Sequence, residues 1–432
     1  MLGVTRLLIN FLATTWRPMS RWAGRVAFNG TQVPAATGAA VRGEEFRVSL
    51  LGMPLIVVLA AAAVVLPILT AWVWARQSSR YVAAGVGRFG LVVASQLAAV
   101  LLVAALANDY GYFYGTWTGL WRGVAQAVTG SSNGPLTMHT IRRGTTSAHL
   151  AGTLAAANDP RFSTPAQWPT RGRLESAVIH GGITQLRASA HIFLPPQYFQ
   201  PRYAHTLFPA LEVFTGYPGS NRQLTEKLKY QHFLLRDLHH HTARPMVLVM
   251  MRSSPVMPRD AECTDVPGGP QVQTFFAQDV PREITTHYRV QPDGWGAIGD
   301  STGGYCAAKV TMLNPATFRA AASLSGYFTT LHDNTTGSLW GGSRVLRDLN
   351  DLDWRMRHMP APPVSLLVTT SRDEVGPLGI GNSRRFLSLV RPPLRASAII
   401  EPHGGHNFTT WVPEIAKALS WLSARLPAPR RG

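Results

Sequence analysis

Two long stretches without a charged residue most constrain how this chain can fold. Residues 48–75 contain MPLIVVLAAAAVVLPILTAWVW, and residues 89–107 read FGLVVASQLAAVLLVAALA. At ~1.5 Å per residue, either stretch is long enough as a helix to cross a hydrocarbon core of ~30 Å. A helix in the core of a soluble protein would normally carry a polar stripe or end sooner. We therefore predict two transmembrane helices over 48–75 and 89–107, with a kink at Pro67 in the first.

The orientation of this predicted hairpin is ambiguous. The connection between the helices carries Arg76, Arg80 and Arg88, which favours a cytoplasmic connection and places both flanks on the opposite side. The segment 1–47 is also rich in arginine and favours the cytoplasm by the same rule. That segment has no apolar run of the length that a cleavable signal peptide needs, and we expect it to be a mobile extension.

The rest of the chain divides into an interfacial segment, a soluble domain and a tail. Residues 108–135 hold an aromatic cluster typical of a membrane–water interface, followed by the linker-like sequence SSNGP. The aromatic residues of this cluster are Tyr110, Tyr112, Phe113, Tyr114, Trp117 and Trp121. We expect a globular domain over 136–427 and a basic tail over 428–432. The 41 Lys and Arg residues outnumber 23 Asp and Glu but form no basic run longer than two residues, which argues against nucleic acid as a partner.

Short apolar segments alternate with helical patterns in the soluble domain. This alternation predicts the α/β class, with a mostly parallel sheet covered by helices on both faces. The predicted helices are 223–237, 304–313, 383–390 and 413–426. The predicted strands are 188–194, 210–215, 246–251, 296–299, 320–324, 364–369 and 397–400.

The sequence GWGAIGDSTGGYCAA holds the motif that carries chemistry. Residues 299–303, GDSTG, fit the G-x-S-x-G pattern of a nucleophile elbow, in which a serine sits on a sharp turn between a strand and a helix. An apolar strand precedes the motif and a helix of small residues follows it, as this turn requires. The motif therefore predicts Ser301 as a catalytic nucleophile.

A serine nucleophile needs a histidine base, and the histidine needs a carboxylate that orients it. In chain order the acid and then the histidine should follow the serine. His406, in PHGGHNFTTW, is preferred over His403 because Gly404 and Gly405 free the loop at that point. The acid should follow the strand 364–369, where Asp373 and Glu374 stand side by side. Spacing does not separate these two carboxylates, and we favour Glu374 only slightly.

The expected oxyanion donors are the backbone N–H groups of Tyr217, in the turn GYPGS, and of Thr302, at the start of the helix.

Several other polar residues are expected to have structural roles. Asp300 is too close to the nucleophile to serve as the acid, and Asp279 is expected to orient a loop. The three consecutive histidines 239–241 are expected at a solvated helix end, and we expect no metal site and no cofactor. Two cysteines, Cys263 and Cys306, exclude a disulfide scaffold but could pair with each other.

These segments together resemble the putative esterase family of α/β-hydrolases, which includes esterase D-like enzymes and the mycolyltransferases of actinobacteria. The matching pieces are FTGYPG, GDSTGGYCAAK, ATFRAAASLSGYF and GGHNFTTW, and the resemblance extends over roughly residues 172–427. It is closest to actinobacterial, membrane-anchored members with membrane spans before the hydrolase domain. The resemblance implies a hydrolase domain outside the cytoplasm of a multi-pass protein in the cell membrane.

Two functions of different classes follow from these observations. The first is a serine esterase or acyltransferase that forms an acyl-enzyme and acts on an ester or acyl donor, including lipids or glycolipids of the cell envelope. The second is a catalytically silent binding protein of the envelope on the same fold. Retention of the serine, the histidine and a carboxylate favours the enzyme, since the fold alone would not.

Overall fold

The computed structural model describes residues 53–76, 82–111, 121, 156–376 and 378–432. The expected extension over 1–47, the expected linker and most of the expected aromatic cluster lie outside the described residues.

The two apolar stretches form long helices, α2 (Met53–Arg76) and α3 (Val82–Gly111). Within them, Pro54–Ala75 and Val86–Asn108 are long and apolar enough to cross a membrane. Helix α3 begins at Val82 rather than at the expected residue 89, because AAGVGR continues the helical stretch before the uncharged run. The two helices pack against each other, and small α3 residues such as Ser95, Ala98 and Ala105 are buried there.

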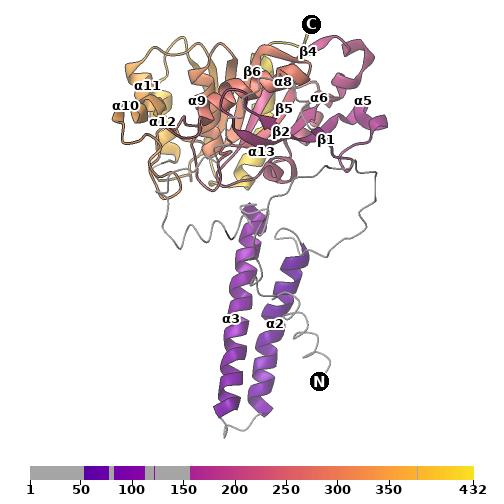
Figure 1. Cartoon of the computed structure of the whole chain (residues 1–432), viewed down its shortest axis with the longest axis vertical. Coiled ribbons are helices and arrows are strands. Elements are labelled where there is room, and N and C mark those ends of the chain that lie inside the picture. Colours follow the sequence, from indigo (N-terminus) through magenta and orange to yellow (C-terminus); the bar gives the residue numbers. More distant parts are fainter. Residues whose placement is uncertain (1–52, 77–81, 112–120, 122–155, 377) are drawn as a thin grey trace, which may run out of the picture. The chain divides into compact units, whose positions relative to one another are not determined.

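The second part of the chain is built on one twisted, mixed sheet (Figure 1). Its strands run in the order β1-β2-β3-β5-β4-β6-β7-β8-β9, and β10 pairs with the start of β4. The pairs from β5 to β9 are parallel, whereas β1, β2 and β3 join antiparallel at one end. The strand bounds are β1 Ala156–Asn158, β2 Arg173–His180, β3 Arg187–Leu194, β4 Thr206–Thr215, β5 Val247–Arg252, β6 Val290–Asp300, β7 Phe318–Leu324, β8 Ser365–Ser371, β9 Arg395–Glu401 and β10 Arg430–Arg431.

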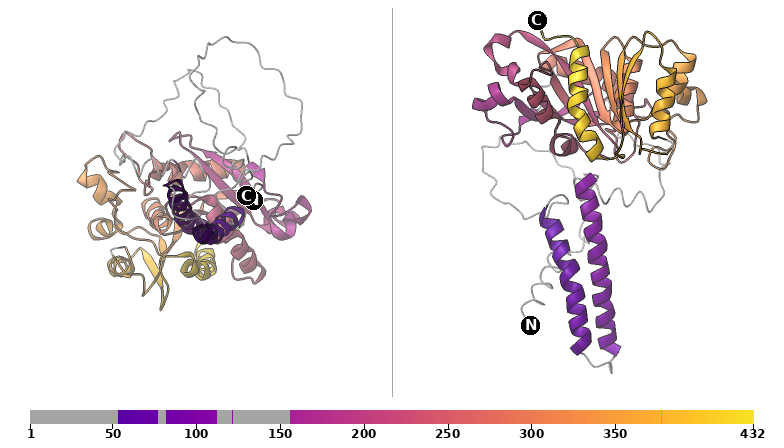
Figure 2. Two further views of the ribbon diagram at one scale, coloured as in Figure 1. Left: turned by 90° about the horizontal axis from the view of Figure 1, so that it is seen from below. Right: turned by 180° about the vertical axis from the view of Figure 1, so that it is seen from behind.

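Helices cover both faces of this sheet, as expected for the α/β class. Alternate residues of the parallel strands point to opposite faces, so each face has its own apolar core. Helices α8, α9, α11 and α12 pack on one face, and α6 and α13 pack on the other, where Figure 2 shows α13 crossing the sheet in its right-hand view. The helix bounds are α5 Trp168–Arg171, α6 Tyr230–His239, α7 Val272–Thr274, α8 Val280–His287, α9 Thr302–Leu313, α10 Arg344–Asn350, α11 Leu352–His358, α12 Ile380–Leu389 and α13 Phe408–Arg425.

Shorter helical segments complete the fold. Gln223–Lys227 and Phe275–Asp279 are single π-helical turns, and Pro165–Gln167, Pro196–Phe199 and Pro201–Tyr203 are 3₁₀ turns. The predicted helix 223–237 is thus broken between the π turn and α6, where Lys229 adopts a left-handed conformation with φ 52°. The tail expected over 428–432 includes β10 and therefore pairs with the sheet.

Candidate active site

Ser301 lies between the last residue of β6 and the first residue of α9, as the elbow motif predicts. Its backbone has φ 55° and ψ −123°, a strained conformation for a residue with a side chain. The flanking glycines allow the turn to close. A Cβ on Gly299 would lie 2.4 Å from the carbonyl group of Gly303, and one on Gly303 would lie 2.6 Å from the carbonyl oxygens of Phe214 and Thr215.

The structure brings Ser301, His406 and Glu374 together in one chain of hydrogen bonds. Nε2 of His406 lies 2.8 Å from Oγ of Ser301, and Nδ1 of His406 lies 2.7 Å from Oε1 of Glu374. These distances allow the carboxylate to hold the imidazole while its other nitrogen faces the serine hydroxyl. Trp411 packs edge-on against the imidazole, with ring centroids 5.0 Å apart, and restricts its rotation.

Glu374 is held in its charged form by its hydrogen bonds. Burial alone would raise its pKa, but the hydrogen bonds of His406 and Thr370 outweigh burial, and the pKa lies below its usual value. The hydroxyl of Thr370 donates to Oε2 of Glu374 at 2.8 Å. A charged acid in this position stabilises an imidazolium at His406.

The remaining candidates for base and acid lie outside this chain of hydrogen bonds. Asp373 contacts His403 instead, with Oδ2 3.3 Å from Nδ1 and 3.2 Å from the backbone nitrogen of Gly404. The side chain of Asp373 is 52% exposed and that of His403 is 89% exposed, whereas that of Glu374 is 6% exposed. The adjacent carboxylates therefore point to different histidines.

The two expected oxyanion donors flank the serine. Tyr217 is the second residue after β4 and lines, with Ser301 and His406, a cavity of about 250 Å³ that Phe408 and Trp411 also border. Thr302 is the first residue of α9, where backbone N–H groups have no partner inside the helix and the helix dipole favours negative charge. Both groups remain predictions as oxyanion donors.

Asp300 has a role that the sequence analysis missed. Its buried Oδ2 accepts hydrogen bonds from the backbone N–H of Gly216 at 2.9 Å and from Nε2 of Gln223 at 3.4 Å. Burial raises the pKa of Asp300 to about 7, although the hydrogen bond of Gly216 and the charge of His406 lower it. The residue before the nucleophile thus fixes the turn that carries Tyr217. Its position inside GDSTG was the available signal.

A buried polar cluster lies behind Thr302. The hydroxyl of Thr302 donates to Oδ2 of Asp260 at 3.3 Å and accepts from Tyr327 at 3.3 Å, and Tyr327 also donates to Glu262 at 2.6 Å. Burial raises the pKa of Glu262 to about 8 and lowers that of Lys309, whose ammonium contacts the carbonyl of Glu262, to about 7. The cluster fastens the loop before Cys263 to helix α9.

The other conspicuous residues take structural roles. Asp279 accepts from the backbone N–H groups of Ile183 at 2.8 Å and Thr184 at 3.0 Å, and so orients the turn between β2 and β3 as expected. The histidines 239–241 lie exposed at the C-terminal end of α6. Cys263 and Cys306 form a disulfide, the pairing that the sequence left open.

Comparisons with known proteins agree with this fold. The sequence model of the family described as "Putative esterase" matches residues 183–373. The S-formylglutathione hydrolase of Agrobacterium tumefaciens has a TM-score of 0.51 and 13% identity, with 63% of this chain and 99% of that chain covered. A ferulic acid esterase has a TM-score of 0.50 and 16% identity, with 60% and 100% covered.

Among curated proteins, the MPT51 antigen of Mycobacterium leprae (strain TN) is 35% identical over 75 residues, which are 17% of this chain and 25% of that protein. The chain thus spans about a quarter of the length of this relative. The fold is that of the α/β-hydrolases, and the family whose model matches part of the chain is the one that the motifs resemble. The same match supports the expected class of enzyme, a carboxylic-ester hydrolase.

Proposed function

We propose that this protein is a serine esterase or acyltransferase that acts on carboxylic esters through Ser301, His406 and Glu374. The observation that carries the proposal is the continuous chain of hydrogen bonds from Glu374 through His406 to Ser301, at 2.7 and 2.8 Å. The family match supports ester hydrolysis as the reaction.

In the proposed reaction, Oγ of Ser301 attacks the acyl carbonyl while Nε2 of His406 accepts its proton. The backbone N–H groups of Tyr217 and Thr302 stabilise the oxyanion, and Glu374 stabilises the imidazolium. His406 then gives the proton to the leaving alcohol, which leaves an acyl-enzyme on Ser301. Water as the acceptor completes hydrolysis, and a hydroxyl group of a second molecule completes transfer.

We further propose that α2 and α3 cross the cell membrane and that the hydrolase domain lies outside the cytoplasm. Exposed apolar side chains on both helices, such as Val64, Val100 and Val103, would be covered by lipid. The Cys263–Cys306 disulfide also supports an extracytoplasmic domain, because disulfides persist mainly in oxidising compartments. Lipids or glycolipids of the cell envelope are then accessible ester substrates.

Labelling with a fluorophosphonate tests the function. The full chain in detergent should be labelled at Ser301 and should hydrolyse 4-nitrophenyl butyrate. Ser301→Ala should lose the label and on the order of 10⁴–10⁶ in kcat, the typical cost of removing a triad nucleophile. Ser388→Ala, which changes an exposed serine on α12, should behave as the wild type. Wild-type protein that is neither labelled nor active would favour the silent binding protein.

A further inference from the structure

A second, larger cavity adjoins the turn that follows β4. It has a volume of about 540 Å³ and is formed by β2, β3, the end of β5 and the residues after Gly219. Three arginines line it, and none of the described residues that line it is acidic. The lining residues used below are His191, Ser220, Asn221, Arg252 and Met257 together with Arg187 and Arg222.

Arg252 is the central cation of this cavity. It is the last residue of β5 and pairs with Thr215, the residue before the turn of Tyr217, so it lies at the carboxyl edge of the parallel strands. Ligands of open α/β sheets bind at that edge. Burial lowers the pKa of the Arg252 guanidinium, and no carboxylate among the described residues forms an ion pair with it. A half-buried guanidinium without a counter-charge has lost part of its hydration, and an anion bound beside it would compensate for that loss.

The other arginines differ in their partners. Arg222 is neutralised by Glu226, with Nε 2.9 Å from Oε1 and Nη2 3.1 Å from Oε2. Arg187 is exposed and its Nη2 lies 3.4 Å from Nε2 of His180. Arg252 and Arg187 therefore give the cavity its positive charge.

Buried polar atoms at the same cavity have no protein partner. They are Oγ of Ser220, Oδ1 of Asn221 and Nδ1 of His191, and the residues Ser220 and Asn221 are each only 8% exposed. The amide nitrogen of Asn221 is already fixed by the carbonyl of Ser189 at 2.7 Å, which leaves its oxygen for a ligand. Burial lowers the pKa of His191, so this imidazole is neutral near pH 7. Buried polar groups normally have partners, and a polar ligand would supply them.

The cavity is connected to Ser301 through one short turn. Gly216 to Gly219 border the cavity of Ser301, and Ser220 to Arg222 border the second cavity. The hydroxyl of Tyr217 donates to the carbonyl of Pro258, next to Met257 in the wall of the second cavity. Adjacent residues of one segment therefore line both cavities.

We propose that this cavity binds a negatively charged group, a carboxylate or a phosphate, carried by the ester substrate, with Arg252 as its main ligand. A guanidinium matches both anions because it donates two parallel hydrogen bonds to their oxygens. The inference rests on the proposed ester hydrolysis and names the substrate class of that site as anionic esters.

Two matched pairs of esters test the proposal on the full chain in detergent. One pair has the anion in the acyl group: the 4-nitrophenyl monoester of glutarate against 4-nitrophenyl valerate. The other has it in the leaving group: the butyrate of 3-carboxy-4-nitrophenol against that of 4-nitrophenol. We expect the wild type to prefer the anionic ester in one pair by about 10- to 100-fold in kcat/KM, the effect of a charge-assisted hydrogen-bonded pair.

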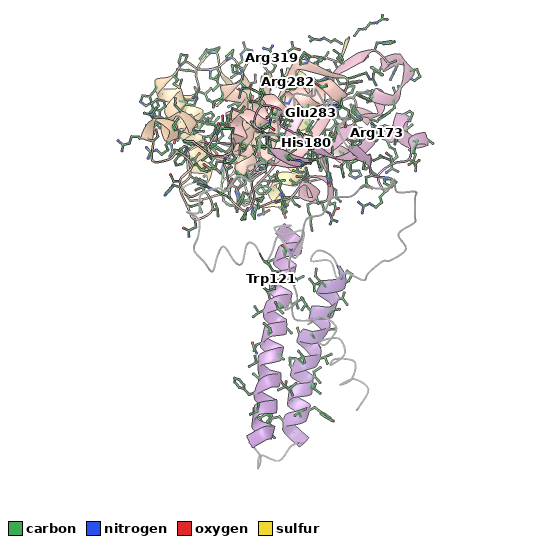
Figure 3. The ribbon with its side chains drawn as sticks, in the orientation of Figure 1. Trp121, Arg173, His180, Arg282, Glu283 and Arg319 are labelled. Carbon is green, nitrogen blue, oxygen red and sulfur yellow. A yellow bond between two sulfur atoms is a disulfide. The ribbon has the colours of Figure 1, made fainter. Side chains whose placement is uncertain are left out.

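Variants distinguish a loss of anion recognition from a general loss of activity. Arg252→Gln should reduce that ratio to near one, and Arg252→Lys, which keeps the charge without the planar fork, should give an intermediate ratio. The control Arg319→Gln removes an exposed arginine at the amino end of β7, the opposite edge of the sheet, and should keep the wild-type ratio (Figure 3). Equal rates within both pairs, or a preference that survives Arg252→Gln, would overturn the proposal.

A binding measurement keeps this inference separate from the esterase proposal. Calorimetric titration with inorganic phosphate should show binding to the wild type that is at least tenfold weaker in Arg252→Gln and unchanged in Arg319→Gln. If no ester is hydrolysed but phosphate binds in this pattern, the reaction is wrong and the anion site stands. If phosphate does not bind and no ester pair shows a preference, the anion site is wrong.

Discussion

Asp373 and Glu374 are neighbours in the chain, but their carboxylates contact different histidines of the loop between β9 and α13. Glu374 turns inward to Nδ1 of His406 at 2.7 Å, and Asp373 turns outward to Nδ1 of His403 at 3.3 Å. Both interactions are carboxylate–imidazole contacts, and only the first continues to a serine hydroxyl. The position of each carboxylate–histidine pair relative to Ser301 therefore determines which pair can act with the serine.

Amide substitutions should separate these two carboxylates. Glu374→Gln should lose about 10⁴ in kcat, since an amide beside a catalytic histidine can favour the wrong tautomer. Asp373→Asn, on the exposed pair, should lose less than about tenfold. Steady-state kinetics on 4-nitrophenyl butyrate measure both, and a larger loss for Asp373→Asn would mean that another acid orients the base.

Asp300 should make stability depend on pH. Its pKa is raised to about 7, so the folded chain keeps a proton that the unfolded chain loses near pH 4. The stabilisation is full below pH ~4 and is lost as the pH rises through about 7, with a ceiling of roughly 4 kcal/mol.

Asp300→Asn removes this titration while keeping an oxygen for the N–H of Gly216. Urea unfolding at pH 4.5 and pH 8 should show wild-type stability, relative to the variant, falling between the two values. A difference that is constant with pH would show that Asp300 has an ordinary pKa.

The sequence predicted the parts of the site that depend on local geometry. A glycine-flanked serine between a strand and a helix has few other conformations, so the position of Ser301 follows from its neighbours. The choice between Asp373 and Glu374 depends on how a turn after β8 meets a loop after β9, and spacing alone holds no information on that. Arg252 was not singled out for the same reason, because its significance comes from the pairing of β5 with β4.

Helix α9 follows the nucleophile directly, and a disulfide and hydrogen bonds hold it to the loop after β5. Cys306 is joined to Cys263, and Lys309, one turn further on, donates to the carbonyl of Glu262 at 3.0 Å. Both contacts hold the loop after β5 against the buried side of the helix. Together with the cluster behind Thr302, they fix the helix whose start bears Ser301.

Loss of the disulfide should destabilise this element and the domain. The cysteines are separated by 43 residues, and chain entropy for a loop of that size predicts a loss of about 4 kcal/mol in the free energy of unfolding. The double variant Cys263→Ser, Cys306→Ser should unfold at lower urea than the wild type. A reductant should lower the wild-type midpoint towards the variant and leave the variant unchanged, and equal midpoints without reductant would contradict this expectation.

At the level of elements, the seven predicted strands are all present, because each contains a short apolar run; the runs in β4 to β8 are mostly buried, whereas β9 is only partly buried. Strand β2 was not predicted, because its sequence RLESAVIH alternates polar and apolar residues and one of its sides is exposed. The start of β6 was also placed too late, because Pro292 and Gly294 are unusual inside a strand.

For the whole molecule, the proposed membrane topology makes a direct prediction. A fluorescent protein that matures only in the cytoplasm should stay dark when fused after Gly432, and should fluoresce when inserted near Ser78, between the two apolar helices. The reason is that two spans put both flanks on one side and the connection on the other. A bright fusion after Gly432 would place the hydrolase domain in the cytoplasm.

The hydrogen bond from Tyr217 to the carbonyl of Pro258 joins the turn at the serine to the wall of the arginine cavity. A charged group bound by Arg252 would contact the wall that is hydrogen-bonded to the turn of Tyr217. The backbone N–H of Tyr217 is the proposed donor to the oxyanion. The interaction of Arg252 with the anionic group would then stabilise the transition state more than the bound ground state. Esters without the anionic group would turn over slowly even at saturating concentration. Selectivity would thus reside in kcat.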